Sequence, residues 1–106
     1  MGTDRELLEA AAKAAGWDSW EWLGGDCLNV YDKTGRHALF NPLNDDGEAF
    51  RLAVKLQMEL SIDALFAWAM ADGDLGAGKA CDTGTDIYAA TRRAIVRAAA
   101  EIGSKT

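Results

Sequence analysis

The stretch that decides the fold reads Asn41-Pro42-Leu43-Asn44-Asp45-Asp46-Gly47-Glu48-Ala49 and continues as Phe50-Arg51-Leu52-Ala53-Val54-Lys55-Leu56. Pro42 stops any preceding strand, because proline lacks the N–H group that a strand ladder needs. Asn44 is a favourable N-cap, and acidic residues follow it where the dipole of a helix favours negative charge. Apolar residues then recur at helical spacing, which predicts a helix over about residues 45–58.

An earlier helix is predicted near the start of the chain. Thr3 and Glu6 have the spacing of a capping box, in which each side chain accepts a hydrogen bond from a free N–H group of the first turn. An apolar stripe follows at helical spacing, and Gly16 suits the residue just after a helix. These signals predict a helix over about residues 4–15.

Residues 17–40 alternate between apolar and polar side chains. The alternation places Trp20 and Trp22 on one face of a strand, and it resumes at residues 28–31. Turn signals at Gly24-Gly25-Asp26 and Asp32-Lys33-Thr34-Gly35 separate the alternating runs. The region therefore predicts a three-stranded antiparallel meander.

Residues 59–71 leave the choice between helix and strand open. No glycine or proline occurs between Glu48 and Asp72, so one long helix is compatible with the sequence. However, apolar residues recur at every second position from Leu60 to Met70, and this favours a strand over about residues 60–71. Residues 72–85 are rich in Gly and Asp and predict a loop, with a short strand around 79–81 as an option.

A last helix is predicted from Thr85 or Asp86 to Gly103, with a continuous apolar face. The element order is then α-β-β-β-α-β-(β)-α over a single domain, residues 1–106. This order predicts an α+β fold in which three helices pack on a mostly antiparallel sheet of about four strands.

Composition narrows the classes of function. The formal net charge of −6 argues against direct nucleic-acid binding and is compatible with a basic protein partner. Two cysteines, Cys27 and Cys81, and a single histidine, His37, make a zinc site implausible. Since neither a signal peptide nor a membrane span is evident, we expect a cytoplasmic protein with free thiols and no membrane partner.

The sharpest motif is Gly73-Asp74-Leu75-Gly76-Ala77-Gly78-Lys79-Ala80, which matches the first seven positions of a phosphate-binding loop. In such loops the glycine backbone wraps a phosphate, and a lysine contacts the terminal phosphates. Here Ala80 stands where a Ser or Thr should hold Mg²⁺, and the next residues are not a helix start. Nucleotide or phosphate binding through Gly73, Gly78 and Lys79 is therefore kept only as an alternative.

No catalytic or metal site is predicted, and no cofactor. His37 has no nucleophile near it in the sequence, and Asp45 and Asp46 are explained by their place at a helix start. A basic patch of Arg92, Arg93 and Arg97 is either a docking point for an acidic partner or phosphate, or a solvated face paired with nearby acids.

Two segments of the chain resemble short bacteriophage and prophage proteins grouped as the phage ABA-sandwich domain. They are residues 41–56, quoted above, and Ala90-Thr91-Arg92-Arg93-Ala94-Ile95-Val96-Arg97-Ala98-Ala99-Ala100-Glu101-Ile102-Gly103. The resemblance covers most of the chain and is weaker over residues 60–85; the family places sheet at about residues 60–71, which supports the strand predicted there. It implies a prophage accessory protein in the bacterial cytoplasm and assigns no catalytic residue.

Three hypotheses about function follow. The first is a non-enzymatic phage protein that binds and modulates a host protein, for example an anti-CRISPR inhibitor that mimics nucleic acid. Its partner-binding surface would combine exposed tryptophans with a continuous acidic face: Trp20, Trp22, Glu21, Asp26, Asp32, Asp45, Asp46, Glu48 and Asp63. The second is the phosphate binder described above. The third is a self-associating structural phage component, so a monomer or a small homo-oligomer is expected.

Overall fold

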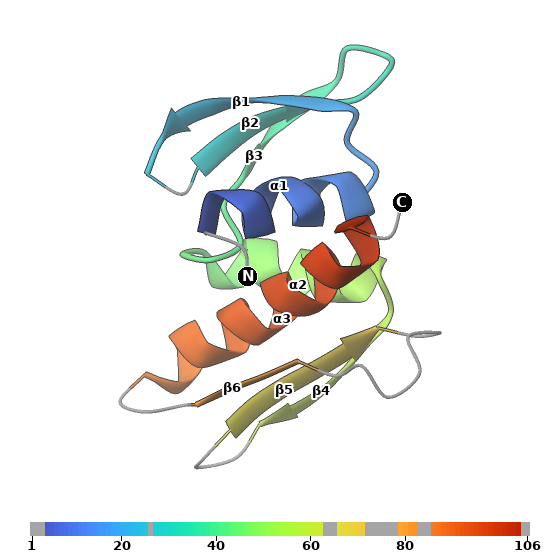
Figure 1. Cartoon of the computed structure of the whole chain (residues 1–106). Helices are drawn as coiled ribbons and strands as arrows, with labels where there is room; N and C mark the ends of the chain where they lie inside the picture. Colours follow the sequence, from blue (N-terminus) through green and yellow to red (C-terminus); the bar gives the residue numbers. More distant parts are fainter. Residues whose placement is uncertain (1–3, 26, 63–65, 72–78, 83–85, 105–106) are drawn as a thin grey trace.

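The computed structural model describes residues 4–25, 27–62, 66–71, 79–82 and 86–104, with the side chains of residues 59–85 left out. Two three-stranded antiparallel sheets enclose a middle layer of three helices (Figure 1). The helices are α1 (Asp4–Ala14), α2 (Asp46–Lys55) and α3 (Ile87–Ser104). The first sheet contains β1 (Ser19–Gly24), β2 (Cys27–Tyr31) and β3 (His37–Phe40), and the second contains β4 (Met58–Ile62), β5 (Phe66–Ala71) and β6 (Lys79–Asp82).

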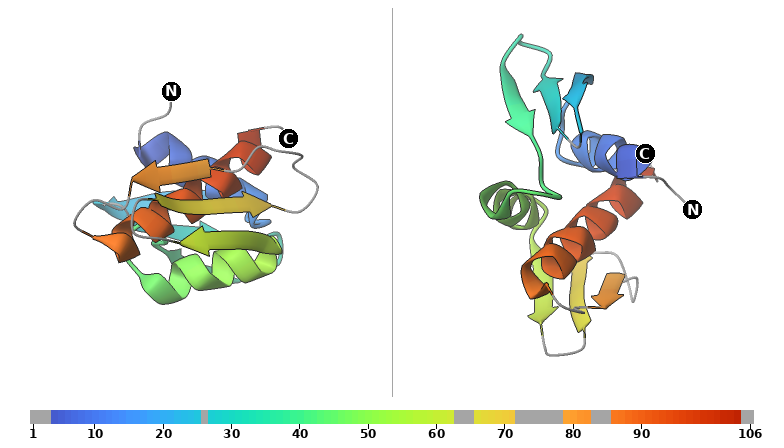
Figure 2. Two further views of the ribbon diagram at one scale, coloured as in Figure 1. Left: turned by 90° about the horizontal axis from the view of Figure 1, so that it is seen from below. Right: turned by 90° about the vertical axis from the view of Figure 1, so that its left-hand side faces the viewer.

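The α+β class is confirmed, but two details of the expected sheet are wrong. The described residues form six strands rather than about four, and the helices lie between two sheets instead of covering one (Figure 2). The run predicted as one strand over 60–71 is a hairpin, in which Met58 pairs with Ala71 and Ile62 with Ala67. Period-two alternation does not reveal where a chain reverses, so one long apolar run can contain two strands. The optional strand around residues 79–81 is confirmed as β6.

Helix α2 begins and ends slightly inside its predicted bounds of 45–58. Asp45, rather than Asn44, is the N-cap, and its carboxylate accepts a hydrogen bond from the N–H of Glu48 at 3.3 Å. At the other end Gln57 has φ +54°, a left-handed conformation that terminates the helix. Glycine is the usual residue at such a position, and its absence here explains why the sequence does not mark this end.

The first sheet turns its apolar face toward the helices. Leu28 and Val30 of β2 are fully buried, and they pair with Trp22 and Trp20 of β1. The indole N–H of Trp22 donates to the Glu9 carboxylate of α1 at 2.9 Å, and the Arg5 guanidinium lies 4.3 Å from the ring centroid. Trp22 therefore attaches the sheet to α1, and Trp20 and Trp22 are partly buried against the core instead of forming an exposed aromatic surface.

Helices α1 and α3 pack closely because the residues between them are small. Ala11 and Ala12 of α1 and Ala98 and Ala99 of α3 are buried in one core cluster. At Gly103 the two backbones lie so close that a Cβ atom would be 1.8 Å from the carbonyl oxygen of Ala10. This contact fixes the separation of the two helices.

Candidate functional site

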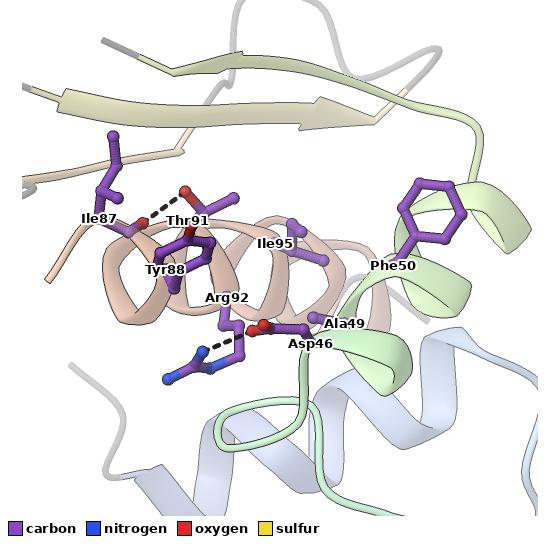
Figure 3. Close-up of a pocket in the computed structure, with 8 residues that line it drawn as sticks. All are labelled: Asp46, Ala49, Phe50, Ile87, Tyr88, Thr91, Arg92 and Ile95. Carbon is purple, nitrogen blue, oxygen red and sulfur yellow. Dashed lines mark hydrogen bonds and ion pairs between the residues drawn. The ribbon is translucent and has the colours of Figure 1, made fainter. Parts of the chain in front are cut away.

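A groove of about 500 Å³ opens between the N-terminal parts of α2 and α3 (Figure 3). Eight described residues line this α2–α3 groove. They are Asp46, Ala49 and Phe50 of α2 and Ile87, Tyr88, Thr91, Arg92 and Ile95 of α3. A volume of this size is typical of ligand and side-chain binding sites.

The walls of the groove are apolar and open to solvent. Phe50 exposes 64% of its surface and Tyr88 68%, while Ile87 exposes 38%. The Thr91 hydroxyl donates to the carbonyl oxygen of Ile87 at 2.7 Å, so its polar atom is engaged inside α3. Val54, one turn after Phe50 on α2, extends the apolar surface and is 58% exposed. Contiguous exposed apolar residues of this kind mark interaction sites on small proteins.

One end of the groove carries an ion pair. The Nη1 atom of Arg92 donates to Oδ1 of Asp46 at 2.6 Å, and its Nε atom donates to the carbonyl oxygen of Leu43 at 2.8 Å. The Arg92 side chain is only 17% exposed, whereas that of Asp46 is 67% exposed. The pair therefore presents its carboxylate to an incoming molecule and holds its guanidinium against the protein.

Two further carboxylates lie at the starts of α2 and α3, next in the sequence to the groove residues Asp46 and Ile87. Asp45 caps α2, and Oδ1 of Asp86 accepts hydrogen bonds from the N–H groups of Tyr88 and Ala89 at 3.0 Å each. Both residues are exposed.

The three predicted basic residues contact different neighbours. Arg92 holds Asp46 as described, and Arg93 donates to both carboxylate oxygens of Asp4, at 2.9 and 3.2 Å. Arg97 is exposed on α3. Arg92 thus joins α3 to α2, and Arg93 joins α3 to α1. This arrangement agrees with the second interpretation of the basic patch, in which acidic residues of the same chain pair with its arginines.

The contact with Arg93 predicts a pH effect on stability. Hydrogen bonds from Arg93 lower the pKa of Asp4 below its usual value of 3.8. A carboxylate whose folded pKa is depressed stabilises the fold above its unfolded pKa, and that contribution is lost as the pH falls through the folded pKa. We expect Asp4→Asn to cost less than about 1 kcal/mol at pH 7, because the Arg93 and Asp4 side chains are 36% and 45% exposed.

Urea unfolding of wild type and Asp4→Asn at pH 7 and at about pH 3 checks this prediction, because the interval spans the range in which an aspartate protonates. The difference between the two proteins should shrink at the lower pH. An equal difference at both pH values would show that the carboxylate charge is not the cause.

The structure brings only some of the predicted acidic residues together. Asp45, Asp46 and Glu48 share the first turn of α2, where Glu48 pairs with Arg51. Asp32 lies in the turn after β2 and accepts hydrogen bonds from Thr34, which lower its pKa, and from the N–H of Arg36. Asp26 and Asp63 lie outside the described residues.

Glu21 lies on the outer face of the first sheet, away from the helices. Its carboxylate accepts a hydrogen bond from the Tyr31 hydroxyl at 2.9 Å, and this bond raises the pKa of Tyr31. The amide of Asn29 donates to the same hydroxyl at 2.8 Å, and the ring of His37 lies 5.9 Å from that of Tyr31. These polar side chains satisfy one another across neighbouring strands.

Most of the possible phosphate-binding loop, including Gly73 and Gly78, lies outside the described residues. Lys79 is the first residue of β6, and the strand continues to Asp82. A phosphate-binding loop needs a helix start directly after its lysine, because the helix N-terminus supplies N–H groups and positive potential. The observed strand does not provide that end.

The sequence interpretation missed the exposed residues of the groove. Helical spacing predicts an apolar face on each of the two helices, but it does not show that Ile87 and Phe50 stay exposed. The available signal was the pair Phe50 and Val54, which lie one turn apart and beside the buried stripe of Ala49, Leu52 and Ala53. When the apolar face of a helix is wider than the area that neighbouring elements cover, the remaining apolar side chains stay exposed to solvent.

Within the described ranges, no three His, Cys, Asp or Glu side chains gather as a metal site would require, and no helix has the length and hydropathy of a membrane span. The chain matches no protein-family model. Neither curated proteins nor solved structures yield a match. The resemblance to the phage ABA-sandwich domain thus stays a prediction from the sequence.

Proposed function

We propose that this protein is a non-enzymatic interaction module, a phage or prophage accessory protein that binds and modulates a host protein through the α2–α3 groove. The observation that carries the proposal is the exposure of Phe50 and Tyr88 on either side of one hollow. Large aromatic side chains lining a pocket are the usual anchors of protein interfaces. An exposed apolar surface also costs solubility, so its presence favours a binding role.

The groove fits this role better than an acidic surface that mimics nucleic acid. Such a mimic requires many carboxylates that are free to meet a basic groove of the partner. Arginines of the same chain already engage Asp46 and Glu48. The Glu21 carboxylate, on a different layer of the fold, already accepts a hydrogen bond from the Tyr31 hydroxyl. Inhibition of a host defence complex, including a CRISPR complex, remains compatible with an apolar groove as the contact surface.

The test compares Phe50→Asp with Leu39→Asp. Leu39 of β3 is 60% exposed, close to the 64% of Phe50, but it lies on the first sheet and outside the groove. After capture of a stoichiometric partner from bacterial lysate, its affinity for each variant is measured by calorimetry. We expect Phe50→Asp to weaken binding by about 30-fold or more, equivalent to about 2 kcal/mol, and Leu39→Asp to leave it unchanged.

Thermal unfolding of both variants provides the folding control, since substitution at such exposed positions should change stability by no more than about 0.5 kcal/mol. A partner that binds Phe50→Asp as tightly as wild type would exclude the groove. Equal losses for both variants would point to a general effect of added charge.

A further inference from the structure

Strand β3 forms one edge of the first sheet, since the strand order is β1-β2-β3. Just before β3, the N–H of Asp32 donates to the carbonyl oxygen of Arg36 at 2.9 Å. Facing residues of an antiparallel pair are hydrogen-bonded at every second position, so Ala38 is the next residue to bond to β2. The N–H and C=O groups of His37 and Leu39 then point away from β2. Both residues are exposed, so this edge can pair with a further strand.

A hollow of about 180 Å³ lies beside this edge. It is lined by Ala38, Leu39 and Phe40 of β3, by Trp17 and by one face of α2, but by no residue of β2. Ala38 pairs with the fully buried Val30 and so lies on the inner face of the sheet, yet Ala38 is exposed. The inner face is therefore uncovered at this point. Because β3 is the strand of this sheet nearest to α2, a strand added to its edge would extend the sheet over α2 (Figure 2).

This β3–α2 hollow and the α2–α3 groove lie on different faces of α2. Arg51, Leu52 and Lys55 line the hollow, whereas Ala49 and Phe50 line the groove. The two sets of lining residues have no member in common. An inference about the hollow therefore goes beyond the proposed function and does not rest on it.

The size of the hollow limits what can enter it. Its volume is below the range of about 300–1,000 Å³ that is typical of small-molecule pockets, so it suits one side chain of a larger partner. Alternate side chains of an added strand would point to the same face as Ala38. The residue opposite Ala38 would enter the hollow, where Trp17 and Leu52 provide apolar walls.

Lys55 adds a preference for charge. It is exposed in the last turn of α2, and none of the residues that the structure describes pairs with its side chain. Arg51, by contrast, is already engaged by Glu48. The full charge of Lys55 exceeds the partial negative charge of about one half at this end of the helix. A carboxylate on the inner face of the added strand would meet Lys55, and residues on one face of a strand are two positions apart.

We propose that the free edge of β3 binds an extended segment of a partner protein as a fourth strand. The segment inserts an apolar side chain beside Ala38 and carries Asp or Glu two residues away, near Lys55. A second copy of this chain fits less well. Its own β3 would bring Arg36 to the face that needs a carboxylate, and its Phe40 is already buried in its own core.

The test selects peptides of about 12 residues, longer than a typical strand, from a random displayed library with the full-length protein as bait. Peptides that also bind Ala38→Ile are removed, because this substitution fills the hollow. Isoleucine favours strands, so thermal unfolding should show Ala38→Ile to be at least as stable as wild type. We expect the remaining peptides to have an apolar and an acidic residue two positions apart, and to bind Ala38→Ile at least about tenfold more weakly.

Amide hydrogen exchange measured by NMR tests the backbone pairing. In the free protein the N–H of Leu39 faces solvent, and a bound strand should slow its exchange at least about tenfold. Methylation of successive peptide nitrogens should abolish binding at every second residue, since only alternate N–H groups of a strand point to one neighbour. A helix in the hollow would give neither result.

Lys55→Glu and Lys13→Glu separate local charge from overall charge. Both lysines are exposed in the last turn of a helix, so the two reversals change the net charge and the helix dipole interaction alike. Lys13 does not line the hollow. We expect Lys55→Glu to weaken peptide binding at least about fivefold at low salt, and Lys13→Glu to weaken it less than about twofold.

Four results would overturn the proposal. They are selected peptides that leave the exchange of Leu39 unchanged, peptides whose binding is unaffected by Lys55→Glu, no peptide whose binding depends on Ala38, and a wild-type dimer in sedimentation that Ala38→Ile dissociates. None of these results concerns the α2–α3 groove, which Phe50→Asp tests separately.

Discussion

Replacing Gly103 by alanine is expected to lower the free energy of unfolding by about 3 kcal/mol. The added Cβ atom would lie 1.8 Å from the carbonyl oxygen of Ala10 and 2.7 Å from the carbonyl carbon. Both are backbone atoms of α1, so no side-chain rotation relieves the overlap. Either α1 and α3 move apart, which opens the alanine-lined core between them, or the last turn of α3 unwinds.

The matched control is Gly47→Ala in α2. There the new Cβ atom would lie 3.4 Å from the end of the Arg51 side chain, a flexible group that can move aside, and 3.8 Å from the Asp45 carboxylate, which is an ordinary contact. Because alanine loses less backbone entropy than glycine on forming a helix, we expect Gly47→Ala to be neutral or to stabilise the protein by up to about 1 kcal/mol.

Urea unfolding monitored by tryptophan fluorescence measures both glycine variants. Opposite signs for the two substitutions would confirm that close helix packing, rather than helix propensity, controls the result at Gly103. If Gly103→Ala is as stable as wild type, the two helices do not approach as closely as described.

The second large effect is expected at Leu28. This side chain is fully buried on β2, where it pairs with Trp22 on one side and Phe40 on the other. Leu28→Ala removes buried methyl groups and leaves a cavity between the first sheet and the helices. We expect a loss of about 3 kcal/mol in the free energy of unfolding, within the usual range for a buried leucine.

Leu39→Ala provides the comparison, since Leu39 lies on the adjacent strand with its side chain 60% exposed. This variant should differ from wild type by no more than about 0.5 kcal/mol. Chemical denaturation of both leucine variants tests the assignment of the two faces of the sheet. Similar losses for the two would mean that the sheet does not bury the face assigned here.

Local signals accounted for much of the fold. Caps, helical spacing and turn residues predicted three helices and the meander within a few residues, because these signals act between residues close in the chain. The end of α2 was missed where Gln57 takes a left-handed conformation without glycine. The hairpin of β4 and β5 was missed because its alternation continues through the reversal.

The candidate site was much less accessible to sequence reasoning. Asp46 was expected to contribute to an acidic face and Arg92 to a basic patch, yet they form one ion pair although they lie 46 residues apart in the chain. Neither residue carries a sequence signal that identifies its partner. Pairs of this kind depend on which helix faces lie together, and only packing decides that.

The sequence by itself determined the helices, the first meander, the α+β class and the acidic charge, since each depends on composition or on short-range periodicity. Only the tertiary structure decided that the helices lie between two sheets, that Trp20 and Trp22 face inward, and that Phe50 and Tyr88 border one groove. The physical reason is that burial is a property of the assembled layers. An apolar side chain is hidden or exposed according to what packs against it, and distant parts of the chain supply those neighbours.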